Sequence, residues 1–276
     1  LQTPGRRAEA CGLLDQAMAI DENDDLSSEL FCTIAAGITY MAVDSTETKA
    51  EPTLLRAAQA VRNGAFDDTG LYPQAMANLA NIYIRKNEYQ KGIELCQEVL
   101  EQSEKVNNYR GVMLAAINLC GTHTELNFFD KALFYNDLGL QYFSPDNETW
   151  GMAASLYERR ADIYTRMGKT DSAFYALNPA VSFYVRATNP RGQIRVILGK
   201  LEAKADYPDS IANVLANYEK IKDKVPGYMY LDYYMGYGKA MYIAGRYKEA
   251  IPLLEGAVRL SKVRPDLETE NHSNRT

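Results

Sequence analysis

The amino-acid sequence predicts an all-α protein built from antiparallel helix hairpins. Two segments on the same plan indicate this: MANLANIYIRKNEYQKGIELCQEVL, shortly after Pro73, and YYMGYGKAMYIAGRYKEAIPLLEGAV, shortly after Leu231. Each holds two apolar helical stretches around a short break that contains Asn or Gly. Small residues also recur at matched places in both segments. Such self-similarity is typical of repeat proteins, in which every hairpin packs on its neighbours.

Small residues recur at two positions when the repeats are counted from Pro73, Met113, Ala154, Arg191 and Leu231. The eighth position holds Ala80, Cys120, Ala161, Leu198 and Gly238. The twentieth position holds Gly92, Ala132, Ala173, Ser210 and Ala250. Paired helices are expected to cross at these residues, where a large side chain would push the axes beyond about 8 to 10 Å. Because Leu198 breaks this rule, the fourth repeat fits least well.

Bulky, aromatic and turn residues recur in the same register. The bulky residues at position 11 are Tyr83, His123, Tyr164, Leu201 and Met241. Position 17 holds Tyr89, Phe129, Thr170, Tyr207 and Tyr247. At position 15, where Asn and Gly would tolerate a left-handed backbone between helices, the residues are Asn87, Asn127, Gly168, Ala205 and Gly245.

This combination of positions resembles the tetratricopeptide repeat (TPR) family. The resemblance implies a right-handed superhelical α-solenoid of about 13 helices that binds another protein or peptide and catalyses no reaction. It implies a single array over residues 1–276, with repeats at 73–112, 113–153, 154–190, 191–230 and 231–265. The repeat starts lie 40, 41, 37 and 40 residues apart. Because the family period is about 34 residues, the helices should be longer than usual.

Partial repeats are expected at both ends of the array. Residues 25–64 form a degenerate repeat, whose second helix should follow Pro52 after a long loop, and 5–20 match a second helix without its first. Residues 266–276 are a polar tail or the start of a further repeat. Both ends look cut, so we expect a fragment of a longer protein, or a protein that has lost an N-terminal helix and its leader.

Composition excludes several classes of partner. Thirty Lys and Arg against 36 Asp and Glu give a net charge of −6, and the basic residues are scattered, so no nucleic acid is expected to bind this chain. No apolar run approaches the roughly 20 residues that span a bilayer, so this chain should not insert into a membrane, although a parent protein could be anchored. The compartment stays open, with the periplasm favoured over the cytoplasm.

Residues suited to catalysis, metal binding or cofactor binding are scarce. The two histidines are His123, at a packing position, and His272, in the polar tail. None of the phosphate-binding, dinucleotide-binding or HExxH motifs occurs. The four cysteines form no CxxC pair and are expected to be small buried hydrophobes, with a pairing of Cys96 and Cys120 left open. We therefore expect no catalytic, metal or cofactor residues; an enzyme with a pocket between helices is the least supported alternative.

The TPR resemblance implies a partner-binding groove on the concave side, lined by the first helix of each repeat. Polar and aromatic groove candidates are Asn81, Arg85, Glu125, Glu158, Asp162, Arg166, Arg195, Glu202, Lys239 and Tyr242. Their charges alternate in sign, which favours a partner held by mixed polar contacts. The alternative for each residue is an ordinary solvated helix face.

Two interpretations of the cellular role follow from family analogy. Long-period arrays of this kind resemble the sensory or scaffolding parts of larger bacterial regulatory proteins involved in signal transduction. The alternative is a free-standing adaptor in the cytoplasm.

Overall fold

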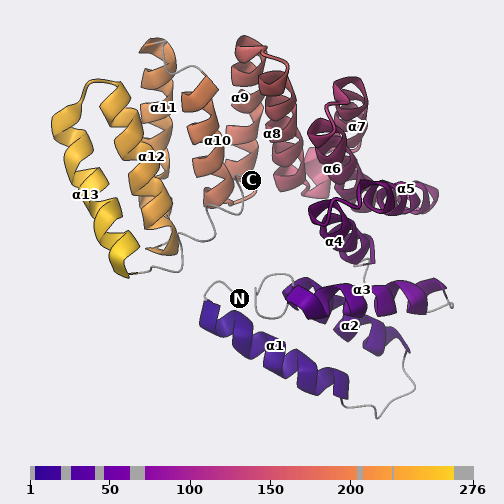
Figure 1. The fold of residues 1–276 in the computed structure, drawn as a ribbon. Helices are drawn as coiled ribbons and strands as arrows, with labels where there is room; N and C mark the ends of the chain where they lie inside the picture. The colour runs from indigo at the N-terminus through magenta and orange to yellow at the C-terminus, as the bar shows by residue number, and fades with distance from the viewer. Residues whose placement is uncertain are drawn as a thin grey trace. The chain divides into compact units, whose positions relative to one another are not determined.

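The computed structural model describes residues 4–19, 26–40, 47–62, 72–203, 208–225 and 227–263, and all regular structure within them is helical (Figure 1). The α-helices are α1 (Pro4–Ala19), α2 (Leu26–Tyr40), α3 (Glu47–Arg62), α4 (Tyr72–Arg85), α5 (Tyr89–Lys105), α6 (Tyr109–Glu125), α7 (Phe129–Gln141), α8 (Trp150–Arg166), α9 (Thr170–Arg186), α10 (Pro190–Ala203), α11 (Pro208–Ile221), α12 (Tyr230–Ile243) and α13 (Tyr247–Val263). Short 3₁₀ helices are η2 (Pro145–Asn147), η3 (Lys222–Lys224) and η4 (Gly227–Met229). The predicted all-α class is confirmed. The predicted tail at 266–276 lies outside the described residues.

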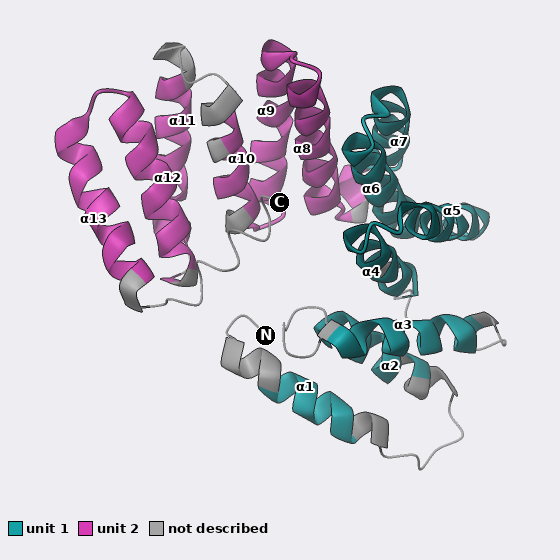
Figure 2. Cartoon of the chain, viewed as in Figure 1, with its two compact units in different colours: residues 1–143 teal, residues 144–276 magenta. Residues whose placement is uncertain are grey.

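The chain divides into two compact units, residues 1–143 and residues 144–276 (Figure 2). Unit 1 holds α1 to α7, and unit 2 holds α8 to α13. In unit 1, α2 packs on α3, α4 on α5 and α6 on α7; in unit 2, α8 packs on α9 and α12 on α13. The predicted helix hairpins are therefore present in both units. That the whole chain forms one array stays a prediction.

The same three-residue turn joins consecutive helices at six places in the described residues. Its central residue has a positive φ at Asn87, Asn107, Asn127, Gly168, Thr188 and Gly245. In the first turn, the backbone N–H of Glu88 donates to Tyr83 O at 2.8 Å, and that of Asn87 donates to Ile84 O at 2.9 Å. These two bonds close the helix end and turn the chain. The left-handed backbone predicted at 87, 127, 168 and 245 is confirmed, whereas the turns at 107 and 188 were not predicted.

Regular spacing of these turns explains the long repeat. Asn87, Asn107 and Asn127 are evenly spaced along the chain. Helices α5, α6, α8 and α9 each contain 17 residues. One such helix together with its turn makes half of a repeat. Longer helices, as predicted, account for part of the wide spacing of the repeat starts, since α4, α7, α10, α11 and α12 contain only 13 or 14 residues.

Thr188 is a strained member of this set, and its replacement by glycine is expected to stabilise unit 2. A β-branched residue at φ +50° is held in a conformation that costs about 1 to 2 kcal/mol. Thr188→Gly should therefore raise the free energy of unfolding by about 1 kcal/mol. The reciprocal change, Gly168→Thr, should lower it by about as much, since a Cβ there meets nothing within 4 Å and only the backbone is strained. Urea unfolding followed by fluorescence of Trp150, the single tryptophan, measures both; equal stabilities would contradict the strain.

Small residues lie where paired helices approach most closely. Ala80, Ala132 and Ala173 are fully buried. A Cβ added to Gly92 would lie 2.8 Å from Ile84 Cγ1 and 3.2 Å from Ala80 O, so positions 8 and 20 of this repeat do face each other. The packing rule on which the predicted fold depends is therefore present. The side chains of Leu198 and Ser210 are outside the described residues.

The loop expected before Pro52 is wrong, because α3 begins at Glu47 and Pro52 lies inside the helix. The first turn of α3 is anchored on both of its sides. Ala50 is fully buried, and Lys49 pairs with Asp15 of α1 at 3.1 Å. A proline this close to the helix N-terminus removes one N–H from the helix, and these contacts outweigh that loss.

All four cysteines are free, so Cys96 and Cys120 form no disulfide. Cys11, Cys96 and Cys120 are buried, as predicted for small core residues, and Cys32 is half-buried. Burial is the largest effect on the pKa of the Cys96 thiol, which is raised to about 12. A thiol in this state stays protonated and unreactive at neutral pH.

Candidate functional site

In unit 1, the predicted groove residues lie on the first helices α4 and α6. Asn81 and Arg85 are one turn apart on α4, and Glu125 ends α6. Arg85 and Glu125 are exposed, whereas Asn81 is half-buried. The two helices contact each other, and the Asn118 side chain donates from α6 to Ala77 O of α4 at 3.1 Å. A buried hydrogen bond thus fixes the register of these neighbouring first helices.

In unit 2, the predicted groove residues lie on α8, α10 and α12. They are Glu158, Asp162, Arg166, Arg195, Lys239 and Tyr242. The side chain of the remaining candidate, Glu202, is outside the described residues. Tyr242 is 60% exposed and packs edge-on against Tyr247, with ring centroids 5.3 Å apart.

Glu158 of α8 and Arg195 of α10 form an ion pair through two guanidinium nitrogens. Behind them, Tyr184 of α9 is only 1% exposed, and its hydroxyl donates to Glu158 and accepts from Arg195 Nη2 at 2.9 Å. The Ser155 hydroxyl lies 3.0 Å from the same oxygen. The carboxylate raises the pKa of Arg195, and burial raises that of Tyr184 to about 12. Both groups keep their protons at neutral pH.

This network connects matched positions of successive repeats, because Glu158 and Arg195 are each the fifth residue of their repeat. Sequence reasoning identified the two charged residues but missed Tyr184. The residue in the sequence that could have pointed to Tyr184 is Gly192. A Cβ at this position would lie 2.6 Å from the Tyr184 ring. Gly192 therefore lets α10 approach the ring of a buried tyrosine closely.

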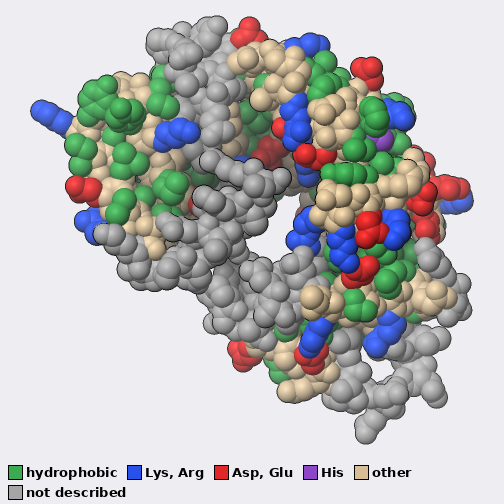
Figure 3. All heavy atoms as spheres, viewed as in Figure 1, with side chains coloured by type: hydrophobic (Ala, Val, Ile, Leu, Met, Phe, Trp, Pro, Cys, Tyr) green, Lys and Arg blue, Asp and Glu red, His purple; other side chains and the backbone are tan. Residues whose placement is uncertain are grey.

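A second ion pair lies farther along α8. Arg166 Nε donates to Asp162 Oδ1 at 3.4 Å, and the two residues are one helical turn apart. Their side chains are 35% and 43% exposed, so a partner could reach both. Acidic and basic side chains are likewise interspersed on the face seen in Figure 3. Both signs of charge are therefore exposed on α8, and that they line a partner-binding groove stays a prediction.

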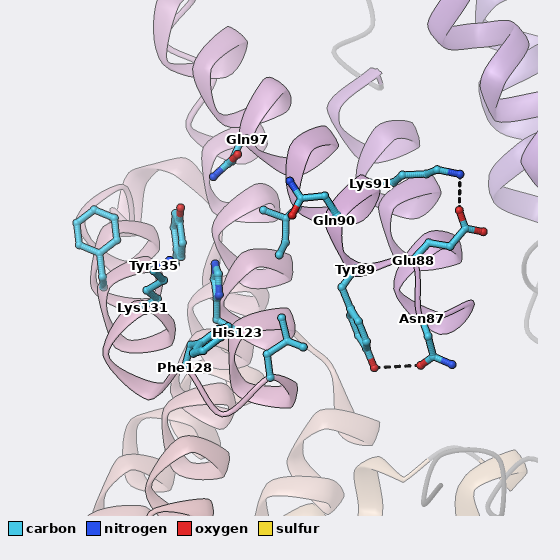
Figure 4. Close-up of a pocket in the computed structure, with 13 residues that line it drawn as sticks. Asn87, Glu88, Tyr89, Gln90, Lys91, Gln97, His123, Phe128, Lys131 and Tyr135 are labelled. Carbon is cyan, nitrogen blue, oxygen red and sulfur yellow. Dashed lines mark hydrogen bonds and ion pairs between the residues drawn. The ribbon is translucent and has the colours of Figure 1, made fainter.

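A separate open groove of about 950 Å³ lies in unit 1 between the second helices α5 and α7. Figure 4 shows Tyr89, Gln90 and Lys91 on one side of the groove, and Lys131 and Tyr135 on the other. The floor of the groove is formed by the end of α6 and the turn that follows it, with His123, Leu126 and Phe128. Sequence reasoning did not predict this groove.

His123 is a neutral aromatic part of this floor. It is 5% exposed and stacks on Tyr135, with ring centroids 5.4 Å apart and planes 2° from parallel. Burial, followed by the charge of Lys131, lowers the pKa of His123. Its Nδ1 is buried and has no hydrogen-bond partner in the described structure. The predicted packing role of His123 agrees with this environment.

Mild acid should therefore destabilise unit 1 through His123. The unfolded chain binds a proton below a pH of about 6.5, whereas the folded state resists protonation because the pKa of His123 is lowered. The contribution of neutral His123 to the free energy of unfolding is thus fully present above about pH 6.5 and is lost as the pH falls below that value. Urea unfolding followed by circular dichroism between pH 7 and 5 should show this slope. His123→Gln should flatten the slope and His272→Gln should keep it; an unchanged slope in His123→Gln would contradict the assignment.

No group of three or more His, Cys, Asp or Glu side chains in the described ranges could hold a metal ion. None of the described helices combines the length and the apolar character needed to cross a bilayer.

Comparison with known proteins relates this geometry to a family. The family model for the tetratricopeptide repeat matches residues 75–108, which cover most of α4 and all of α5. Protein KINESIN LIGHT CHAIN-RELATED 2 of Arabidopsis thaliana is 26% identical over 184 residues, which represent 63% of this chain and 27% of that protein. The matched region thus spans about a quarter of the plant relative.

A solved structure shows the same fold. The crystal structure of BtubC (BKLC) from P. vanneervenii matches this chain with a TM-score of 0.54 at 17% identity. The match covers 96% of this chain and 94% of that one. The predicted α-solenoid of helix hairpins is confirmed.

Proposed function

Because this chain is a tetratricopeptide-repeat protein, we propose that it binds a protein or peptide along the face of its first helices. Repeats of this family are interaction or scaffolding modules. The observation that carries the proposal is the ion pair between Glu158 and Arg195, supported from behind by Tyr184. A face on which matched positions of α8 and α10 are held together is preorganised, which lowers the cost of binding.

The binding surface of unit 2 would combine this fixed pair with more accessible groups. Asp162 and Arg166 offer both signs of charge, and Tyr242 offers an exposed aromatic ring, a common anchor at interfaces. A partner with alternating acidic and basic residues and at least one apolar side chain would complement this surface. Binding and not catalysis is the activity these groups favour.

Photo-crosslinking in the source cells tests the proposed face. A photoreactive phenylalanine analogue would replace Tyr242 of α12 in one variant and Tyr175 of α9 in another. Both tyrosines are strongly exposed, at 60% and 63%, but only Tyr242 lies on a first helix. We expect a discrete crosslinked protein from the Tyr242 variant and none from the Tyr175 variant. Equal crosslinking at both sites would remove the support for this face.

Exchanging the charges of Asp162 and Arg166 should weaken binding of that crosslinked partner about tenfold. The double variant Asp162→Arg with Arg166→Asp keeps an ion pair within one turn of α8, so stability should change by only a few tenths of a kcal/mol. The surface potential offered to the partner is inverted, however. Calorimetry measures the affinity, and thermal unfolding checks the fold. Arg195 is a poorer choice for charge reversal, because its loss would leave Glu158 without its cationic partner and would remove one hydrogen bond from the buried Tyr184 hydroxyl.

We further propose that this binding module belongs to a longer bacterial regulatory protein and serves it as a sensory or scaffolding part. The plant relative, of which the match spans about a quarter, supports the idea that such repeats occur within longer chains. Sequencing the gene on both sides distinguishes this role from that of an adaptor. A membrane segment and an output domain in the same reading frame support a regulator, whereas a stop codon directly after this region favours the adaptor.

A further inference from the structure

We propose that the groove between α5 and α7 is a second docking site, which takes a short amphipathic helix of a partner protein with an acidic residue facing Lys131. This site lies on second helices and is separate from the first-helix face described above. Its walls, its floor and its one available charge each specify a property of the occupant.

The size of the groove fits a helix. Tyr89, Ile93 and Gln97 line the groove from α5 at intervals of four residues, and Lys131, Phe134 and Tyr135 line it from α7. About two helical turns of α5 therefore face the groove, a length of about 12 Å, and about one turn of α7 faces them. A helix segment about 12 Å long and about 10 Å across occupies roughly 900 Å³. The groove, at about 950 Å³, matches that volume.

The floor and one wall are apolar and partly uncovered. Phe128 is 55% exposed and Phe134 is 62% exposed, although both line the same groove. Between them lies the stacked pair of His123 and Tyr135, and burial lowers the pKa of His123, so that its ring is neutral at neutral pH. Covering exposed aromatic rings is favourable by roughly 25 cal/mol for each Å² removed from water. The occupant therefore presents large apolar side chains on the side that enters the groove.

Several polar groups at the rim already have partners on α5 or in the turn before it. Lys91 pairs with Glu88, the Tyr89 hydroxyl donates to Asn87 Oδ1 at 3.0 Å, and Gln90 donates to Glu94 at 2.7 Å. These bonds hold the rim in place without leaving a charge for a ligand.

Lys131 is the exception. Its ammonium lies 5.8 Å from the centre of the Phe128 ring and forms no ion pair with any carboxylate in the described structure. A cation beside an apolar groove attracts an acidic residue at the edge of the occupant and disfavours a basic one. Charge complementarity therefore selects an amphipathic helix with a carboxylate at one edge of its apolar face.

Synthetic helical peptides test the site directly. Each probe is a labelled 14-residue peptide on an alanine and glutamine scaffold, with Leu or Phe at four positions spaced i, i+3, i+4 and i+7. One edge position carries Glu, Gln or Lys. By fluorescence anisotropy, the Glu peptide should bind several times more tightly than the Gln peptide, and the Lys peptide most weakly. Lys131→Glu should reverse this order, whereas Lys105→Glu, at the exposed end of α5, should keep it.

Truncation of the wall tests the apolar contact. Phe134→Ala removes a mostly exposed ring, so the fold should persist while affinity falls about tenfold; Tyr175→Ala, an equally exposed aromatic in unit 2, should leave affinity unchanged. A central proline in the peptide should abolish binding, because proline breaks a helix. Absence of binding by every probe, equal affinity of Phe134→Ala, or full affinity of the proline peptide would each overturn the proposal. The charge exchange at Asp162 and Arg166 should not affect these probes, which separates this site from the first-helix face.

Discussion

Replacing Gly238 with valine is expected to lower the free energy of unfolding of unit 2 by about 3 kcal/mol. Gly238 is buried on α12 where it meets α13, and a Cβ there would lie 2.7 Å from Leu254 Cδ2 and 2.8 Å from Leu254 Cγ. Valine adds two further carbons at this crossing. Either Leu254 leaves its position or the two helices separate, and overpacking of this kind costs about 1 to 3 kcal/mol or more.

Urea unfolding followed by Trp150 fluorescence measures this cost, and two alanine variants serve as comparisons. Gly199→Ala on α10 meets only Leu177 Cδ1 at 3.4 Å, an ordinary contact. Because alanine favours helix over glycine by about 1 kcal/mol, Gly199→Ala should stabilise unit 2. Gly238→Ala should fall between the two, since the end of the Leu254 side chain can partly yield. If Gly238→Val proved as stable as the parent chain, close approach of helices at this position would be excluded.

Truncating Tyr184 to alanine should have the largest effect of any single change, about 4 kcal/mol. Large aromatic side chains removed from a core cost about 3 to 5 kcal/mol because a cavity remains. Tyr184 is 1% exposed, and its ring lies directly against Gly192 of the next helix. Its hydroxyl also supports Glu158 and Arg195, so their register would loosen as well.

Tyr184→Phe separates the ring from the hydroxyl. Phenylalanine keeps the packing but leaves Glu158 with one donor fewer, which should cost about 1 to 2 kcal/mol. The same variant should also weaken binding of the partner identified by crosslinking at Tyr242, because the ion pair on the first-helix face is then less firmly held. A Tyr184→Ala variant within about 1 kcal/mol of the parent would show that the site collapses without loss.

The hairpin fold was predictable because each of its requirements is local. The residue in the middle of a turn must accept a left-handed backbone, which Asn87 and Gly168 do. The residue at a crossing must be small, which Ala80 and Ala132 are. Each of these requirements concerns the type of a single residue and recurs in every repeat, so a pattern in the sequence is enough to find it.

The details of the sites depended on contacts between residues far apart in the chain. Glu158 and Arg195 were both predicted to face a partner protein. In the structure they form an ion pair with each other, although they lie 37 residues apart in the chain. The α5–α7 groove arises because both helices pack on α6 and side chains fill only part of the space between them. Neither outcome follows from residue type or spacing alone. The Pro52 expectation failed for the same reason, since contacts with other helices extended α3.

The turns at Asn87, Asn107 and Asn127 have a consequence for how such a chain lengthens during evolution. The same turn joins the two helices of a hairpin and joins one hairpin to the next. Duplication of a single helix with its turn would therefore insert one helix and still satisfy the local sequence requirements of every turn. Every helix downstream would nevertheless change from a first to a second helix or the reverse, because first and second helices alternate. Duplication of a whole hairpin with both of its turns restores the alternation. Natural variants of this chain should therefore differ in length by pairs of helices and never by one.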